Sequence, residues 1–438
     1  MACLTFLLFV LAALPGAGSP AASAETVRFN DWFLDKALRI DIHHVGSFDF
    51  ERACIDELKE EKFFSGPKAR LTQGLEMGGH YLFTLHDKAS GTLIYGNGYS
   101  GLFNEWRTIA EARAGVWRAI EHTLIVPWPK KAVILTISKR THEGTLVEIL
   151  EQEIAMEKRF IGGDNPYPGL KSKPVMANGK PGDKVDLLIV GDGYTRKEMS
   201  KFDRDVKKTF QAIFEIEPFK SRRRDFNVWS IQSPSIDSSV DQPRKPSKVA
   251  WKNTALGVSF NTFDLPRYAL TTRIHTLFDI AAHAPHDVIV LIFNDPRSGG
   301  GGIQNLYAVC SADSTVSIQV LIHELGHALT GLADEYYTSS VSYIDYYPEG
   351  VEPPDPNITA LLDPSNIKWK HLIEEGTPIP TPKSPKYRGV VGCFEGAGYK
   401  AKGLYRPCLD CVMFSLRTSD FCPVCLEAVE KSIDYYAR

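Results

Sequence analysis

The segment LIHELGHALTGLADEYY, residues 321–337, contains two histidines that are four positions apart, His323 and His327. Apolar residues at positions 321, 325, 328 and 329 follow the spacing of a helix buried along one side, so we expect a helix over 314–329. Residues four apart lie one above the other on a helix, and both imidazoles therefore project from one face. The spacing predicts one metal ion held from adjacent turns, and zinc suits two neutral imidazoles.

Glu324 follows the first of these histidines. It is rotated from His323 by about 100° around the helix, so we expect it to act as a general base rather than as a ligand. In this interpretation Glu324 takes a proton from a water molecule that the metal activates. The alternative is a solvated helix face whose histidines bind nothing.

A third ligand is needed, because a catalytic zinc site combines three protein ligands with one open position. The helix is expected to end at Gly331, since glycine adopts a left-handed conformation without a steric penalty. A turn at Gly331 would bring Asp334 or Glu335 back toward the metal. We predict Asp334 as the ligand and keep Glu335 as the alternative. If neither residue binds a metal, the pair is an acidic cluster at the helix end that interacts only with the backbone or with solvent.

The N-terminus predicts export. Residues 1–24 form an apolar run that ends in Ala22-Ser23-Ala24, which fits a secretory cleavage site, although no Lys or Arg precedes the run. An uncleaved anchor is the alternative. No later segment is long and apolar enough to cross a bilayer, so we expect a secreted, periplasmic or extracellular protein without membrane contact after cleavage. The net charge of −3 is too small to give the surface a strong electrostatic potential of one sign, which argues against a nucleic-acid partner.

The length of 438 residues predicts two domains. Short alternating strands fill residues 25–160 and predict a small all-β sandwich, in which His43 and His44 point to opposite faces and cannot share one metal. Residues 161–182 are dense in Gly, Pro, Asn and Lys and predict a linker. From 183 to 438 buried strands alternate with helical spacing, which predicts an α/β (α+β) domain that carries the histidine helix.

The stretch HELGHALTGLADEY resembles the signature of the IgA-peptidase family of zinc metallopeptidases, peptidase family M64, within the metzincin group. DKALRIDIHHVGS is similar to the start of that family's N-terminal domain, and VDLLIVGDGYT, GLYRP and FCPVC are similar to its catalytic-domain landmarks. The metzincin motif is HExxHxxGxxH; here the glycine and the third ligand come one residue later, with Ala at 333 and Asp at 334. The resemblance implies a metzincin-like fold, a Zn²⁺ cofactor and an endopeptidase acting on protein or peptide substrates.

The same resemblance implies two further features of the catalytic domain. Metzincins carry a methionine-containing turn below the zinc, and Met413 in Cys411-Val412-Met413-Phe414 is the candidate, as an apolar floor rather than a ligand. A strand edge beside the metal would pair with an extended substrate, and we expect residues 306–311 to form it. Residues 298–302, SGGGG, are expected to be a mobile loop or a simple connector.

Five of the seven cysteines that follow the leader lie in the last 46 residues. Cys408-x-x-Cys411 and Cys422-x-x-Cys425 have the spacing of a structural zinc site, but export favours disulfides. Both interpretations remain open for these four residues.

Two other functions are compatible with the pattern. One is an exported non-catalytic protein in which the zinc helix only stabilises the fold and the β-domain binds a protein or a glycan. The other keeps the metal and hydrolyses an amide that is not a peptide. Glu324 argues against the first, because a structural site has no use for a base.

Overall fold

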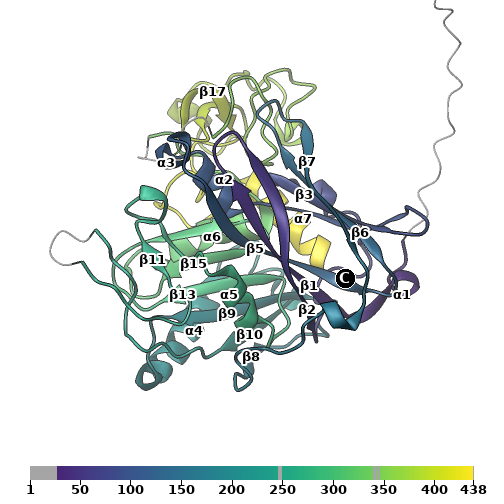
Figure 1. Ribbon diagram of the computed structural model, residues 1–438. Helices are drawn as coiled ribbons and strands as arrows, with labels where there is room; N and C mark the ends of the chain where they lie inside the picture. Colours follow the sequence, from purple (N-terminus) through teal and green to yellow (C-terminus); the bar gives the residue numbers. More distant parts are fainter. Residues whose placement is uncertain (1–26, 245–248, 339–342, 344–345, 438) are drawn as a thin grey trace, which may run out of the picture.

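The computed structural model describes residues 27–244, 249–338, 343 and 346–437. Two antiparallel sheets make up the N-terminal region (Figure 1). The first has the order β2-β1-β5, with bounds Glu51–Glu61, Phe33–Gly46 and Arg118–Pro129. The second has the order β4-β3-β6-β7, with bounds Leu93–Tyr99, Tyr81–Asp87, Val133–Arg140 and Leu146–Ile154. Short helices flank them: α1 (Phe29–Trp32), α2 (Leu102–Arg107) and α3 (Ala110–Arg113).

Strands of the two sheets contribute apolar faces to one core, and β3 shows the pattern most clearly. In β3 the side chains of Tyr81, Phe83 and Leu85 are buried, whereas the residues between them are partly exposed. Successive side chains of a strand point to opposite faces, so this pattern gives one apolar face per strand. The apolar faces of both sheets meet in a single cluster, as predicted for a β-rich N-terminal region.

A six-stranded sheet forms the centre of the second region, in the order β14-β15-β13-β9-β10-β8. The four inner strands are parallel: β9 (Val185–Asp192), β10 (Phe226–Ile231), β13 (Val288–Phe293) and β15 (Tyr307–Ser311). The edge strands β8 (Ser172–Met176) and β14 (Gly300–Ile303) are antiparallel to their neighbours. Every residue of β9 and β13 is buried, because a parallel sheet is covered on both faces.

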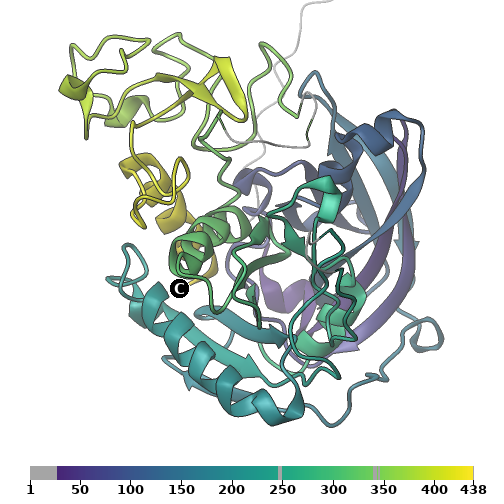
Figure 2. The same cartoon turned by 90° about the vertical axis from the view of Figure 1, so that its left-hand side faces the viewer.

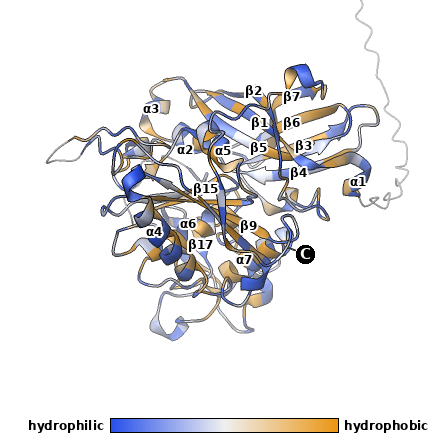
Figure 3. Cartoon of the chain, turned by 90° about the horizontal axis from the view of Figure 1, so that it is seen from below, coloured by the Kyte–Doolittle hydropathy of each residue, from blue (hydrophilic) through white to orange (hydrophobic). Residues whose placement is uncertain are grey.

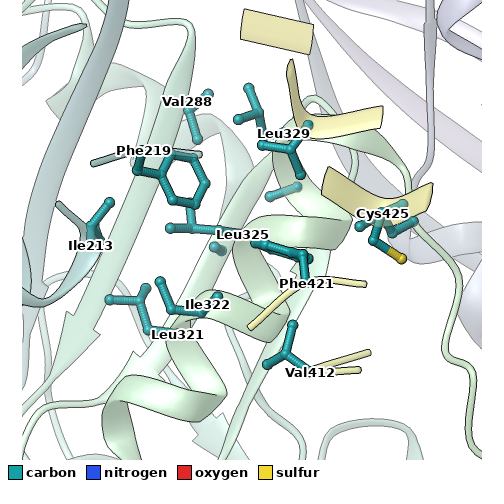
Figure 4. Packing of buried hydrophobic residues seen from close by; sticks show 14 of the residues in the cluster. Ile213, Phe219, Val288, Leu321, Ile322, Leu325, Leu329, Val412, Phe421 and Cys425 are labelled. Atoms are coloured by element: carbon teal, nitrogen blue, oxygen red, sulfur yellow. The ribbon is translucent and has the colours of Figure 1, made fainter. Parts of the chain in front are cut away.

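Helices cover both faces of this sheet. One face packs against α4 (Met199–Ile213), α6 (Ser317–Thr330) and α7 (Pro423–Tyr436), and the other against α5 (Ile274–Ala281) and α2. Figure 2 shows α4 lying along the sheet. In Figure 3 the outer side of α4 is coloured as hydrophilic, whereas the strands of the sheet are coloured as hydrophobic. Leu321, Leu325 and Leu329 of α6 point into the core (Figure 4), and with Ala328 they form the apolar stripe that the sequence predicted; Ile322 adds a further buried side chain.

Two small hairpins complete the described part of the second region. One pairs β11 (Ser259–Phe260) with β12 (Ala269–Leu270), and the other pairs β16 (Phe394–Ala397) with β17 (Lys400–Arg406). The segment that carries β17 lies at the opposite end of the molecule from β8 (Figures 1 and 2).

Three local predictions need correction. Part of the expected linker, residues 172–176, is the edge strand β8, whose side chains are half-buried or exposed and therefore give no apolar signal. Residues 307–311 form β15, which lies between β13 and β14 and not at the edge. The edge strand is β14, which overlaps the glycine run 298–302 that was expected to be a loop or connector.

This strand contains glycine because α6 packs directly against its backbone. A Cβ on Gly302 would lie 2.3 Å from the carbonyl oxygen of Glu324 and 2.9 Å from Cβ of His327. No larger residue fits that approach, and tertiary contact outweighs the low strand preference of glycine.

The two regions meet through a buried group of charges. Arg39 of β1 donates to Asp41 at 2.8 Å and to Asp279 of α5 at 2.8 Å, and Lys59 donates to Asp279 at 3.0 Å. Arg39 and Asp41 are each 1% exposed, so each charge depends on its partners. These contacts fix the N-terminal sheets against the second region.

Within the described ranges no helix has the length and apolarity needed to span a bilayer. The predicted signal peptide, residues 1–24, lies outside the described residues.

Candidate active site

Helix α6 presents His323 and His327 on one face and ends at Gly331. Gly331 adopts a left-handed conformation with φ of 69°, as its position in the sequence predicted. The chain then turns back, and Asp334 meets both histidines. The distance from Oδ1 of Asp334 is 2.9 Å to Nε2 of His323 and 3.4 Å to Nε2 of His327. The two Nε2 atoms are 3.1 Å apart.

The other nitrogen of each ring is held by the backbone. Nδ1 of His323 lies 2.9 Å from the carbonyl oxygen of Val412, and Nδ1 of His327 lies 2.5 Å from that of Leu332. A carbonyl oxygen only accepts, so both Nδ1 atoms carry the proton and donate it. Both Nε2 atoms therefore face Asp334, and each can exchange its proton for a metal ion, which is how metal-binding histidines are oriented.

This donor set fits a zinc ion. The two Nε2 atoms and Oδ1 of Asp334 converge within 4.8 Å of one another, and a metal ion would take the place of the proton that these atoms otherwise share. Two nitrogens at about 2.0–2.1 Å from a tetrahedral zinc would lie about 3.3 Å apart, close to the observed separation. Asp334 is only 5% exposed, and a buried carboxylate in this position requires a positive charge beside it.

The pKa shifts of Asp334 and His327 also indicate a site that favours a positive charge. Burial alone would raise the pKa of Asp334, yet the two facing imidazoles hold that pKa well below its usual range. Burial alone would lower the pKa of His327, and the Asp334 carboxylate raises it to about 10. The three side chains thus form a buried site that favours positive charge.

Glu324 lines the same cavity as the three side chains. The cavity has a volume of about 610 Å³ and extends along β14, α6 and the segment after α6. Burial raises the pKa of Glu324, and His323 and His327 partly offset that shift. A carboxyl group with a raised pKa is suited to accept and release a proton.

Family models match both regions of the chain. The model of IgA Peptidase M64 matches residues 174–388 and 383–433, and that of the Peptidase M64 N-terminus matches residues 28–151. The chain belongs to peptidase family M64. M64 enzymes are metallopeptidases, in agreement with the possible metal-binding groups of this structure.

Other comparisons add little to the family assignment. Metalloproteinase-II from Bacteroides fragilis is a solved structure that shares 12% identity with this M64 peptidase, with a TM-score of 0.22. The match covers 57% of this chain and 84% of that one, and so low a TM-score carries no argument about the fold. No curated protein matches the chain significantly.

The turn that contains Met413 lies beside the histidine helix of the M64 domain. The Met413 side chain is fully buried, its sulfur is next to Gly326 of α6, and its carbonyl oxygen accepts the N–H of Glu335 at 2.9 Å. The preceding residue, Val412, holds the ring of His323. The turn therefore packs against α6 and orients the ring of His323.

Several residues of the site were missed in the sequence. The hydroxyl of Tyr399 donates to Oδ2 of Asp334 at 2.5 Å, and Arg267 donates to the hydroxyl of Tyr336 at 2.9 Å. Tyr336 is within the motif segment itself, but Tyr399 and Arg267 are more than 60 residues from Asp334 and carry no local signal. The N-terminal region adds three lining residues to the cavity: His80, Ser100 and Glu105.

We expect Tyr399→Phe to weaken zinc binding by about 10- to 100-fold, the usual effect of removing a hydrogen bond to a ligand. The reason is that Oδ2 of Asp334 loses the donor that orients the carboxylate. Competition with a chromophoric chelator measures the affinity. Tyr405→Phe, on β17 and outside the cavity, is the matched control, and equal affinities in the two variants would contradict the assigned role.

Glu335, the alternative third ligand, points away from the histidines. Its Oε1 atom lies 3.1 Å from Sγ of Cys425 and accepts from Asn357 at 3.0 Å. The structure thus separates two adjacent acidic residues that the sequence could not separate. Asp334 faces the histidines and Glu335 faces the cysteines.

Proposed function

We propose that this M64 peptidase is an exported zinc-dependent endopeptidase with a metzincin-like catalytic domain. One observation carries the proposal: two Nε2 atoms and Oδ1 of Asp334 converge beside Glu324 in a cavity of about 610 Å³. His323, His327 and Asp334 would hold the ion, which leaves one coordination position for water or substrate.

A zinc ion bound there would polarise the scissile carbonyl and lower the pKa of water to about 7. Glu324 takes the proton from the attacking water and later delivers it to the leaving amine, as general base and then general acid. Arg267 and Tyr336 line the same cavity and offer N–H and O–H donors for negative charge that develops on the substrate.

The edge strand β14 provides a surface for an extended peptide. It lines the cavity through Gly300, Gly301 and Gly302, and the edge of a sheet can pair with a peptide backbone. Backbone pairing recognises the middle of a chain as readily as its end, which favours internal cleavage. Export is proposed from residues 1–24 of the sequence.

The test uses the purified protein, a denatured protein substrate and a peptide library, with and without a zinc chelator. We expect internal cleavage that chelation abolishes and added zinc restores, with product termini identified by mass spectrometry. A zinc-loaded protein that leaves both substrates intact would favour the non-catalytic binding protein. Hydrolysis restricted to small non-peptide amides would favour the second alternative.

A further inference from the structure

Behind the histidine site lies a group of buried side chains that the proposed reaction does not use: Cys411, Cys422, Cys425 and Glu335. The three sulfur atoms and a carboxylate oxygen all lie within 4.8 Å of one another. All four residues are buried. We propose that they bind a second metal ion, a structural zinc held by three thiolates and one carboxylate.

The ligand types and their spacing fit zinc. Sulfur atoms at about 2.3 Å from a tetrahedral zinc lie about 3.8 Å apart. This distance is compatible with the ligand atoms of this group, which lie within 4.8 Å of one another. Cys422 and Cys425 come from the start of α7, Cys411 comes from the turn below α6, and Glu335 follows α6. Figure 4 shows the Cys425 sulfur beside α6. Three separate segments thus meet at one point, as in a site that fixes tertiary structure.

The surroundings of the group would stabilise thiolates once a metal ion replaces the thiol protons. The backbone N–H of Cys422 donates to Sγ of Cys411 at 3.3 Å. The N-terminus of α7, whose first residue is Pro423, adds partial positive charge beside Cys422 and Cys425. The buried guanidinium of Arg406 interacts electrostatically with Glu335 and offsets part of the remaining negative charge.

Glu335 supplies a second, independent observation. Its side chain is fully buried, and its Oε2 atom has no hydrogen-bond partner among the described residues. An unpaired carboxylate oxygen in the interior is costly unless a cation lies next to it. Its other oxygen is 3.1 Å from Sγ of Cys425, so the carboxylate points into the thiol group.

Disulfides account for this arrangement less well. A disulfide joins two sulfur atoms, and even two bonds, Cys408 to Cys422 and Cys411 to Cys425, would leave Oε2 of the buried Glu335 carboxylate without a partner. Cys408 lies close to Cys422 and completes the paired CxxC spacing, but it does not join the convergent group. A metal ion uses all four converging donors at once.

The second ion would support the first site through the backbone. Asp334 and Glu335 are adjacent, so one metal would fix each side of the same peptide. Cys411 precedes Val412, whose carbonyl oxygen orients His323. The second site thereby anchors the turn below α6 and the third catalytic ligand together.

The test starts with the purified protein before any reductant is added. We expect a second zinc ion per chain by elemental analysis and reaction of all seven cysteines of the described chain after denaturation with chelator. A disulfide that includes Cys411, Cys422 or Cys425, with each other or with Cys408, would lower the thiol count and overturn the proposal.

Cobalt substitution then separates the two sites. In the double variant His323→Ala, His327→Ala we expect Co²⁺ to bind and to show thiolate-to-metal charge-transfer absorption, because only the second site supplies sulfur. This readout is independent of peptidase activity, so its failure is distinct from failure of the proposed function. Absence of bound Co²⁺, or of the sulfur band, in the folded double variant would overturn the second site.

Glu335→Gln tests the fourth ligand without removing a thiol. In the double-variant background it should weaken Co²⁺ binding at least about tenfold, whereas the matched control Cys408→Ser should leave affinity and spectrum unchanged. Loss of binding in Cys408→Ser together with full binding in Glu335→Gln would overturn the ligand set proposed.

Discussion

Replacing Glu324 by Gln is expected to lower kcat/KM by at least about 10²- to 10⁴-fold while zinc stays bound. Gln keeps the shape of the side chain but cannot accept the proton of the attacking water. Glu324 lines the cavity and is not one of the three converging ligands, so the metal site should remain intact. The measurements are kcat/KM on a quenched fluorescent peptide and zinc content by elemental analysis.

Glu374→Gln, an exposed carboxyl outside the cavity, is the matched control and should retain full activity. A zinc-loaded Glu324→Gln variant with unchanged kcat/KM would remove Glu324 from the mechanism.

Asp334→Asn is expected to reduce zinc affinity by more than about 100-fold, beyond the range for residues that only orient a ligand. The change keeps the volume of the side chain but removes the negative charge that faces both Nε2 atoms. Activity at limiting zinc should fall in parallel and return in part at high zinc. Chelator competition gives the affinity, and peptide cleavage at several zinc concentrations gives the activity.

The control for this change is Asp49→Asn, an exposed residue of the N-terminal region. Wild-type zinc affinity in Asp334→Asn would show that another side chain supplies the third ligand. Glu335 points to the cysteines, so we expect that it does not replace Asp334 as a ligand in this variant.

The helix of the site was predictable because its information is local. The apolar spacing of 321, 325, 328 and 329 and the glycine at 331 gave the helix and its end, and the structure has α6 at Ser317–Thr330. Buried strands were expected within 183–438, and β13 (Val288–Phe293) is one of them: a strand covered on both faces is a continuous apolar run. The position of β14 was not predictable, since its Gly302 is required by the close approach of α6.

Other features of the site were not predictable from the sequence because they depend on contacts between distant residues. Tyr399 reaches Asp334 across 65 positions of the chain, from a segment without periodicity. The cysteine spacing indicated either disulfides or a metal, and only the folded chain places Glu335 among the sulfur atoms.

The sequence by itself determined the helix that carries His323 and His327, the carboxyl residue beside its first histidine, and the separation into a β-rich and a mixed region. These depend on residues within a few helical turns or one strand, where spacing dictates which side chains share a face. Only the tertiary structure decided which of two neighbouring carboxylates faces the histidines, because the direction of the chain after Gly331 is set by the turn around Met413 and by Asn357 and Tyr399. Those partners come from distant parts of the chain, and their positions follow from packing rather than from local pattern.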